Sequence, residues 1–297
     1  MQTDIIASTH LGKKSDGSRI YDSSLLVGVP REENRKQYNI DCNDLLFKGY
    51  DVWHAYEFSC LTENGLPVTS VLKIRYDCAS EYIVESKSLK LYLNSFNMTR
   101  LGKNQKECLA LCKAKIEKDL SEKLETAVVV NFLDNKIAKE YIFSDFENII
   151  NYVDETTLKC ENFKETPEIL QTEENEKFQE YKLTFDSLRS NCRVTHQPDF
   201  GDVFIYYDSK KHIKEDSLVK YLVSFRCEYH FHEECVEMIF KRLSDILNPD
   251  DALMVCALYT RRGGIDICPY REKNIGFKED IMKLVDINTF ARYGIKQ

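Results

Sequence analysis

A cysteine and an aspartate seven residues apart suggest a catalytic pair in the stretch SNCRVTHQPDFG, where Cys192 is followed by His196 and Asp199. Cysteine attacks as the thiolate, and its ordinary pKa of about 8.5 leaves little thiolate at neutral pH without a neighbouring base. His196 could be that base, and Asp199 could exchange a proton if burial raises its pKa. The alternative is a buried structural cysteine, because cysteine is among the most buried residue types.

A second candidate is the stretch HFHEEC, which holds His230, His232, Glu233 and Cys235. On a helix, His232 and Cys235 would share a face, and zinc accepts nitrogen and sulfur ligands. A zinc site needs four ligands, however, and no second pair is evident. Adjacent histidine and glutamate could instead bind a heterocycle, because a carboxylate accepts two hydrogen bonds from a guanine-like N–H and amine.

Two basic stretches could bind an anion. In ESKSLK, Lys87 and Lys90 lie three apart, and in RRGG the pair Arg261 and Arg262 precedes two glycines. Arginines can bind phosphates bidentately, and glycines let a backbone approach a ligand closely. Taken singly, each stretch is equally compatible with a solvated surface. The sequence has no Rossmann or P-loop motif, so a nucleotide would be held in another way.

Composition limits the classes of function. The 297 residues are 43% hydrophobic, which is enough for a globular core, and acidic residues outnumber basic ones by 49 to 41. This excess, with no long apolar run, argues against membrane or direct nucleic-acid partners. Eleven scattered cysteines and a start, MQTDIIASTH, without a leader pattern predict a cytoplasmic protein.

These candidate residues must be positioned by alternating strands and helices. Residues 51–61 and 68–77 read as strands joined by an Asn64-Gly65 hairpin. Residues 106–124 have apolar positions at helical spacing, and the β-branched run 126–133 predicts a further strand. The order is therefore two strands, helices and a strand, which indicates an α+β fold with antiparallel sheets.

The second half of the chain repeats this order. ESKSLKLYLNSF (85–96) and KEDSLVKYLVSF (214–225) are identical at six of their twelve positions, and VVVNFL has LMVCALY as its counterpart. A tandem duplication explains both matches. We therefore predict an arm over 1–39, a first module over 40–153, a solvated acidic linker with a short helix over 154–181, and a second module over 182–297.

Together, ESKSLKLYLNSFN, SNCRVTHQPDFG, FHEEC and TRRGGIDICPYR resemble one family, the NADPH-dependent 7-cyano-7-deazaguanine reductases of queuosine biosynthesis, in their long two-module form. The resemblance implies tandem tunnelling-fold modules related to GTP cyclohydrolase I, with antiparallel sheets and helices outside. It also implies a homodimer that uses two NADPH to reduce the nitrile of 7-cyano-7-deazaguanine to an aminomethyl group. The substrate is the free base, although its product later enters tRNA.

The resemblance also implies roles for individual residues. Cys192 is the nucleophile, which forms a covalent thioimide with the nitrile carbon, and Asp199 is the proton donor. The other implied contacts are, for the substrate, Val84, Glu85, Ser86, His232 and Glu233, and for NADPH, Ser86, Lys87, Arg262 and Gly263. No metal is implied.

Other residues lose their candidacy through the resemblance. His196 becomes a loop residue. A functional role for His230 is in doubt because the sequence just before FHEEC departs from that of the family. Cys60 corresponds to Cys192 in the first half, but Pro67 stands where an aspartate is needed. Two alternatives stay open: a zinc-dependent pterin-forming hydrolase on the same fold, and an inactive purine-binding module.

Overall fold

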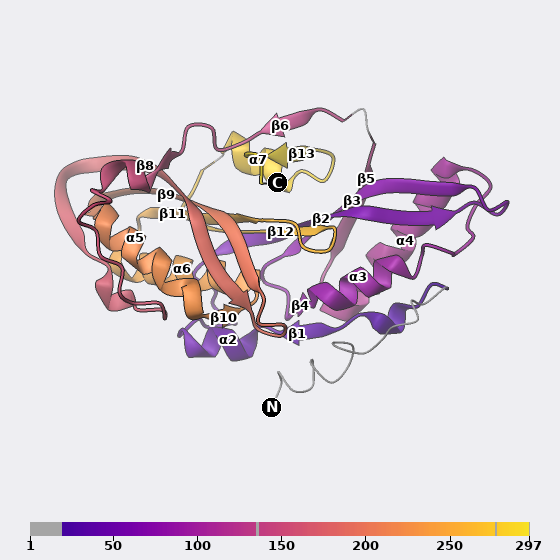
Figure 1. Cartoon of the computed structure of the whole chain (residues 1–297), viewed down its shortest axis with the longest axis horizontal. Helices are drawn as coiled ribbons and strands as arrows, with labels where there is room; N and C mark the ends of the chain where they lie inside the picture. Colours follow the sequence, from indigo (N-terminus) through magenta and orange to yellow (C-terminus); the bar gives the residue numbers. More distant parts are fainter. Residues whose placement is uncertain (1–19, 135–136, 277, 297) are drawn as a thin grey trace.

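Antiparallel strand pairing organises the protein into one nine-stranded sheet that runs through both halves of the chain (Figure 1). The computed structural model describes residues 20–134, 137–276 and 278–296; residues 1–19 of the predicted arm lie outside them. The main strand order is β10-β8-β9-β11-β12-β2-β3-β5, with β7 beside β8. Only the short strands β7 (Glu147–Asn148) and β10 (Tyr229–His230) pair in parallel within this sheet.

The first half has the predicted order of elements. Its strands are β2 (Lys48–Leu61), β3 (Pro67–Asp77) and β5 (Val128–Leu133), and its helices are α3 (Ser86–Asn94) and α4 (Gln105–Leu124). Gly65 has a φ of +85°, which explains why the β2–β3 turn needs a glycine. The apolar positions of α4 at helical spacing pack on β2 and β3, as predicted from the sequence.

The second half repeats the order. Strands β8 (Thr172–Cys192) and β9 (Pro198–Ile213) are followed by α5 (Glu215–Val223), α6 (His232–Ile246) and β11 (Ala252–Tyr259). One more strand, β12 (Ile265–Lys273), pairs with β11 on one side and with β2 of the first half on the other. The two predicted modules therefore share a continuous sheet.

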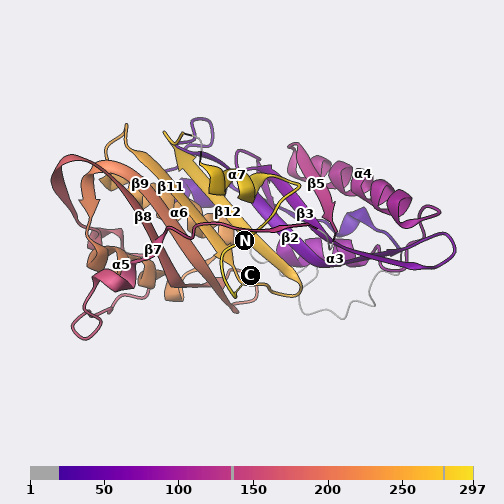
Figure 2. The same ribbon diagram turned by 90° about the horizontal axis from the view of Figure 1, so that it is seen from above.

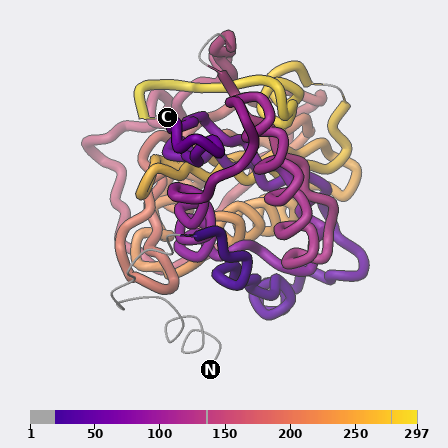
Figure 3. The backbone as a smooth tube through the Cα atoms, turned by 90° about the vertical axis from the view of Figure 1, so that its right-hand side faces the viewer, coloured from indigo at the N-terminus to yellow at the C-terminus, as the bar shows by residue number. Residues whose placement is uncertain are grey.

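Helices α3 to α6 cover one face of the sheet, and the C-terminal segment covers the other (Figures 1 and 2). The second face packs against α7 (Glu279–Val285) and residues near β13 (Phe290–Arg292), which pairs with β6 (Lys139–Tyr141). Seen from the end, the yellow C-terminal segment runs across the top of the molecule (Figure 3). The fold is thus α+β, with a mainly antiparallel sheet between two covering layers.

The described part of the predicted N-terminal arm is built into the fold. Strand β1 (Gly28–Pro30) pairs with β4 (Tyr82–Val84), and Val29 is buried. Helix α2 (Glu32–Gln37) follows it. The remaining short elements are the 3-10 helices Ser23–Leu25, Ile149–Tyr152, Pro167–Ile169 and Ser224–Cys227.

The predicted acidic linker differs from the structure at its end. Residues 172–181 form the first part of β8, and the predicted short helix is the 3-10 turn Pro167–Ile169. Glu173 lies opposite His212 and is paired with it at 3.2 Å, so the acidic strand runs along a basic one. The sequence did not predict this strand because its side chains are mostly exposed, so that it lacks the buried apolar alternation by which strands are recognised.

Candidate active site

The hairpin between β8 and β9 brings Cys192 and Asp199 onto one face of the sheet. Ser190 lies opposite Asp199, and Cys192 shares the face of Ser190 because side chains two positions apart on a strand point the same way. The turn is closed by a hydrogen bond from the Cys192 N–H to the Gln197 carbonyl at 2.8 Å. Cys192 is half-buried, as a reactive cysteine needs to be.

Asp199 lies buried between the Arg262 guanidinium and the His232 ring. One carboxylate oxygen accepts a hydrogen bond from Arg262 and lies 3.5 Å from Nε2 of His232. Burial would raise the pKa of Asp199, but His232 and Arg262 outweigh it, so that the pKa lies below its ordinary value. Without a ligand, Asp199 is therefore a carboxylate at neutral pH.

The start of α6 presents His232 and Glu233. The Phe231 N–H donates to the Glu234 carboxylate at 2.9 Å, which satisfies one of the free amides at the helix N-terminus. The His232 ring packs edge-on against Tyr259, with 4.1 Å between ring centroids. Glu233 is fully buried, and its Oε1 has no hydrogen-bond partner among the described residues.

The start of α3 forms the opposite wall. Glu85 is the N-cap, and its side chain accepts hydrogen bonds from the amides of Lys87 at 2.9 Å and Ser88 at 2.6 Å. Its carboxylate therefore orders the ESKSLK segment. In the second half, Lys214 stands at the matching N-cap and makes no such bond. Of the matching helices α3 and α5, only α3 therefore has a side-chain cap at its N-terminus.

The turn between β11 and β12 supplies Arg262 and Gly263. Gly263 has a φ of +59°, and a Cβ atom there would lie 2.7 Å from Nζ of Lys90. The backbone at Gly263 therefore approaches Lys90 of α3 too closely to leave room for a side chain. Arg262 also donates to Gln197 at 3.1 Å, so this turn touches the β8–β9 hairpin.

All ten residues that the sequence assigned to the site line one cavity of about 370 Å³. They come from both halves of a single chain. The sequence analysis gave no role to several further residues that line the cavity: Trp53, Thr195, Gln197, Thr260, Ile265 and Ile267. Of these, Trp53 is the only tryptophan in the sequence.

Comparisons with known proteins agree with this geometry. A nitrile reductase model, described as the N-terminal part of 7-cyano-7-deazaguanine reductase, matches residues 18–132, and a QueF-like protein model matches 198–275. The "NADPH-dependent 7-cyano-7-deazaguanine reductase" of Rickettsia felis is 40% identical over 269 residues, covering 91% of this chain and 94% of the relative. The chain belongs to the 7-cyano-7-deazaguanine reductase family.

Two further relatives carry the same name. The reductase of Legionella pneumophila is 39% identical over 268 residues, covering 90% of each chain. That of Colwellia psychrerythraea is 38% identical over 271 residues, covering 89% of this chain and 91% of the relative. The similarity therefore spans both halves of the reductase chain. No helix of the described residues is long and apolar enough to cross a membrane.

The cavity fits the NADPH that the names of these reductases imply. Lys87 and Lys90 on α3 and Arg262 on the β11–β12 turn place three cationic side chains along it. Gly263 leaves free the space that a side chain would fill against Lys90. Such a set of cations beside a glycine turn suits the phosphates of a dinucleotide.

Three further residues considered in the sequence, His196, Cys60 and Arg261, do not line the cavity. His196 has a φ of +57° in the hairpin turn, and its ring contacts Tyr229. Cys60 is buried in the core of the first half. The Arg261 guanidinium lies over the Tyr56 ring, 4.0 Å from its centroid.

The zinc alternative needs His230, His232 and Cys235 to converge, but each has a different partner. His230 lines the cavity, but its Nε2 is hydrogen-bonded to Glu228 at 3.3 Å, and its Nδ1 lies 3.5 Å from the Glu234 carboxylate. Cys235 contacts Ser190 at 3.6 Å and His232 faces Asp199. Within the described ranges, the metal-competent cluster is a different one: His54, Asp266 and Cys268.

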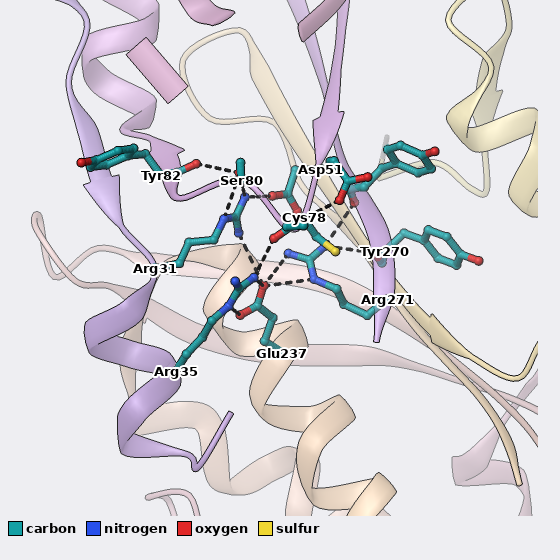
Figure 4. Close-up of polar contacts among 12 residues, drawn as sticks. Arg31, Arg35, Asp51, Cys78, Ser80, Tyr82, Glu237, Tyr270 and Arg271 are labelled. Carbon is teal, nitrogen blue, oxygen red and sulfur yellow. Dashed lines mark hydrogen bonds and ion pairs between the residues drawn. The ribbon is translucent and has the colours of Figure 1, made fainter. Parts of the chain in front are cut away.

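A network of buried charged side chains lies one helical turn beyond Glu233 (Figure 4). Glu237 receives hydrogen bonds from Arg35 at 2.8 Å and from Arg271 at 2.9 Å. Burial would raise the pKa of Glu237, but the surrounding arginines lower it to about 2. The network fixes α2, α6, β2 and β12 to one another through Arg31, Arg35, Asp51, Glu237 and Arg271.

The network also sets the charge of Glu233. Burial and the nearby Asp51 carboxylate raise the pKa of Glu233 to about 8, against the opposing influence of Arg31 and Arg271. The free protein thus holds a proton on Glu233 at neutral pH. A ligand that offers N–H donors would favour the ionised carboxylate instead.

Proposed function

We propose that this protein reduces the nitrile of 7-cyano-7-deazaguanine to an aminomethyl group, with NADPH as the reductant. The observation that carries the proposal is the convergence of Cys192, Asp199, Glu233 and the cationic turn Arg262-Gly263 in one cavity. The names of the reductases that this chain resembles support the same substrate and reductant.

The first chemical step is addition of Cys192 to the nitrile. The sulfur forms a bond to the nitrile carbon, one carbon–nitrogen π bond breaks, and the nitrogen takes a proton. Asp199 is ionised in the free protein, so it must first receive the proton that it donates. The leaving proton of the Cys192 thiol supplies it, and Asp199 passes it on to the nitrogen.

The thioimide that results is reduced in two stages. Two NADPH molecules, bound in succession, would each supply one hydride to the former nitrile carbon, because a four-electron reduction needs two hydrides. After the first, nitrogen expels the Cys192 thiolate and an imine forms; after the second, protonation gives the amine. His232, 3.5 Å from Asp199, is placed to return protons to that carboxylate. Lys87 and Arg262 orient the reductant through its phosphates.

The heterocycle is oriented by the start of α6. In its ionised form Glu233 accepts hydrogen bonds from the ring N–H and the exocyclic amine of the substrate. Val84 and Ser86 contact the base from the opposite wall, where Glu85 caps α3.

This role predicts that Glu233→Gln weakens nitrile binding about 100-fold, because glutamine offers only one acceptor oxygen. In the wild-type protein, affinity should rise as the pH increases toward about 8, where Glu233 ionises, and then level off. The variant should show no such rise. Isothermal titration across this pH range, with Cys192→Ala in both proteins, checks both expectations.

The same substitution should change stability in the opposite direction. Folding raises the pKa of Glu233 from 4.5 to about 8. The contribution of protonated Glu233 to the stability of the folded protein is therefore present below pH 4.5 and is lost as the pH rises to about 8. Glu233→Gln should therefore raise the Tm by roughly 5 °C above pH 8, with less effect near pH 5. The exposed Glu122→Gln serves as control; an equal effect of both variants would contradict the assignment.

The finer architecture remains our proposal. The repeated order of strands and helices supports two tunnelling-fold modules, at 40–153 and 182–297. The homodimer is likewise a prediction. One chain already brings the ten predicted residues into one cavity, so the geometry of the site does not itself require a second subunit.

The decisive experiment is incubation of the purified protein with NADPH and the nitrile. Two NADPH should be oxidised for each nitrile consumed, and the aminomethyl product should appear by mass spectrometry. Binding of the nitrile without NADPH oxidation would indicate an inactive purine-binding module. Stoichiometric zinc that is lost in His232→Ala would instead favour the hydrolase. Either result would overturn the proposed reduction.

A further inference from the structure

Trp53 is the only tryptophan in the chain, and it lies in the wall of the cavity. It stands on β2 between Ile267 of β12 and Ile74 of β3, its partners in the sheet. Its exposed fraction is 1%. The side chain is thus held in the sheet where the two halves meet.

The indole nitrogen of Trp53 has no hydrogen-bond partner among the described residues. Buried tryptophan N–H groups are normally paired, because an unpaired buried donor destabilises the fold. Such an exception calls for an explanation, and a ligand in the adjoining cavity supplies one.

Glu233 shows the complementary feature. Its Oε1 is buried without a hydrogen-bond partner in the described part of the chain, and Glu233 lines the same cavity. Two residues of the cavity wall therefore each carry a buried polar atom without a partner among the described residues: the indole N–H of Trp53, which can only donate, and Oε1 of Glu233, which accepts once the carboxylate is ionised. Val84, Ile265 and Ile267 add apolar surface beside them, as a flat heterocycle requires.

We propose that Trp53 is a specificity-determining residue, whose indole N–H donates to the ring carbonyl oxygen of the bound base while Glu233 accepts from the neighbouring ring N–H. The inference rests on the proposed function and identifies a contact of the same site. A guanine-type ring presents a carbonyl acceptor beside an N–H donor. An adenine-type ring presents an amine and an unprotonated nitrogen there, so both contacts would be lost.

The single tryptophan permits a direct test by NMR. Full-length Cys192→Ala protein labelled with nitrogen-15 has one indole N–H signal. Addition of 7-cyano-7-deazaguanine should shift its proton resonance downfield. The analogue with hydrogen in place of the carbonyl oxygen also lacks the ring N–H, so it should bind more weakly and, at saturation, without this shift. A resonance that behaves identically with both ligands overturns the inference.

A binding comparison gives the second test. Trp53→Phe, in the Cys192→Ala background, should weaken binding of the nitrile about tenfold and of the analogue less than about twofold. Phe58→Leu is the matched control, because Phe58 is buried in the same core but does not line the cavity. It should lower the Tm and leave both affinities within about twofold.

The outcomes separate this inference from the proposed function. An equal loss for both ligands would mean that Trp53 acts through packing alone and would overturn the hydrogen bond. If the wild-type protein reduces the nitrile and Trp53→Phe binds it as tightly, only this inference fails. If the wild-type protein neither binds nor reduces the nitrile, the proposed function fails.

Discussion

Replacement of Cys192 by alanine is expected to abolish NADPH oxidation with the nitrile, by a factor of roughly 10⁴ or more. Without the sulfur, hydride would have to attack the nitrile itself, which is a much poorer acceptor than a protonated thioimide. Binding should persist, because Glu233 and the α3 wall, which hold the heterocycle, are unchanged. NADPH oxidation and a separate binding titration measure the two effects.

Intact-mass spectrometry tests the covalent step more directly. Wild-type protein mixed with the nitrile, without NADPH, should gain the mass of one nitrile, and Cys192→Ala should gain none. Cys227→Ala is the matched control, since Cys227 is an exposed cysteine that does not line the cavity. It should form the adduct at the wild-type rate. A fully active Cys192→Ala protein would exclude the thioimide mechanism.

The parts of the site that the sequence predicts are local. Cys192 and Asp199 are joined by one hairpin, and Glu85 and Lys87 occupy the first turn of one helix. Short motifs preserve such geometry because five or six consecutive residues determine it. The repeated order of elements was predictable for the same reason, since each strand and helix has its own periodicity.

The parts that the sequence does not predict depend on distant pairing. Arg31 contacts Glu237 across 206 positions, and no pattern near either residue indicates that partner. The influence of Asp51 on Glu233 arises from the same assembly, as does the position of Trp53 beside β12. In the sequence, Trp53 is one apolar residue of a strand; only the pairing of β2 with β12 places it at the cavity.

Replacement of Asp199 by asparagine is expected to slow turnover about 10² to 10⁴-fold, because an amide can neither accept the thiol proton nor deliver one to nitrogen. Asp208→Asn is the matched control. It removes the same charge from the same strand, β9, at a residue that does not line the cavity. Turnover at saturating substrate and NADPH, measured for both variants, checks this expectation.

Asp199 could also act only by holding Arg262, and the order of the chemical steps separates the two roles. Adduct formation precedes any use of NADPH, so a proton carrier must affect its rate when NADPH is absent. We expect Asp199→Asn to slow adduct formation about 100-fold or more under that condition. A residue that merely positions Arg262 would instead raise the KM for NADPH and leave the adduct rate unchanged. If that second pattern were observed, the proton would have to pass through another group, and His232, which lies 3.5 Å from the carboxylate, is the next candidate.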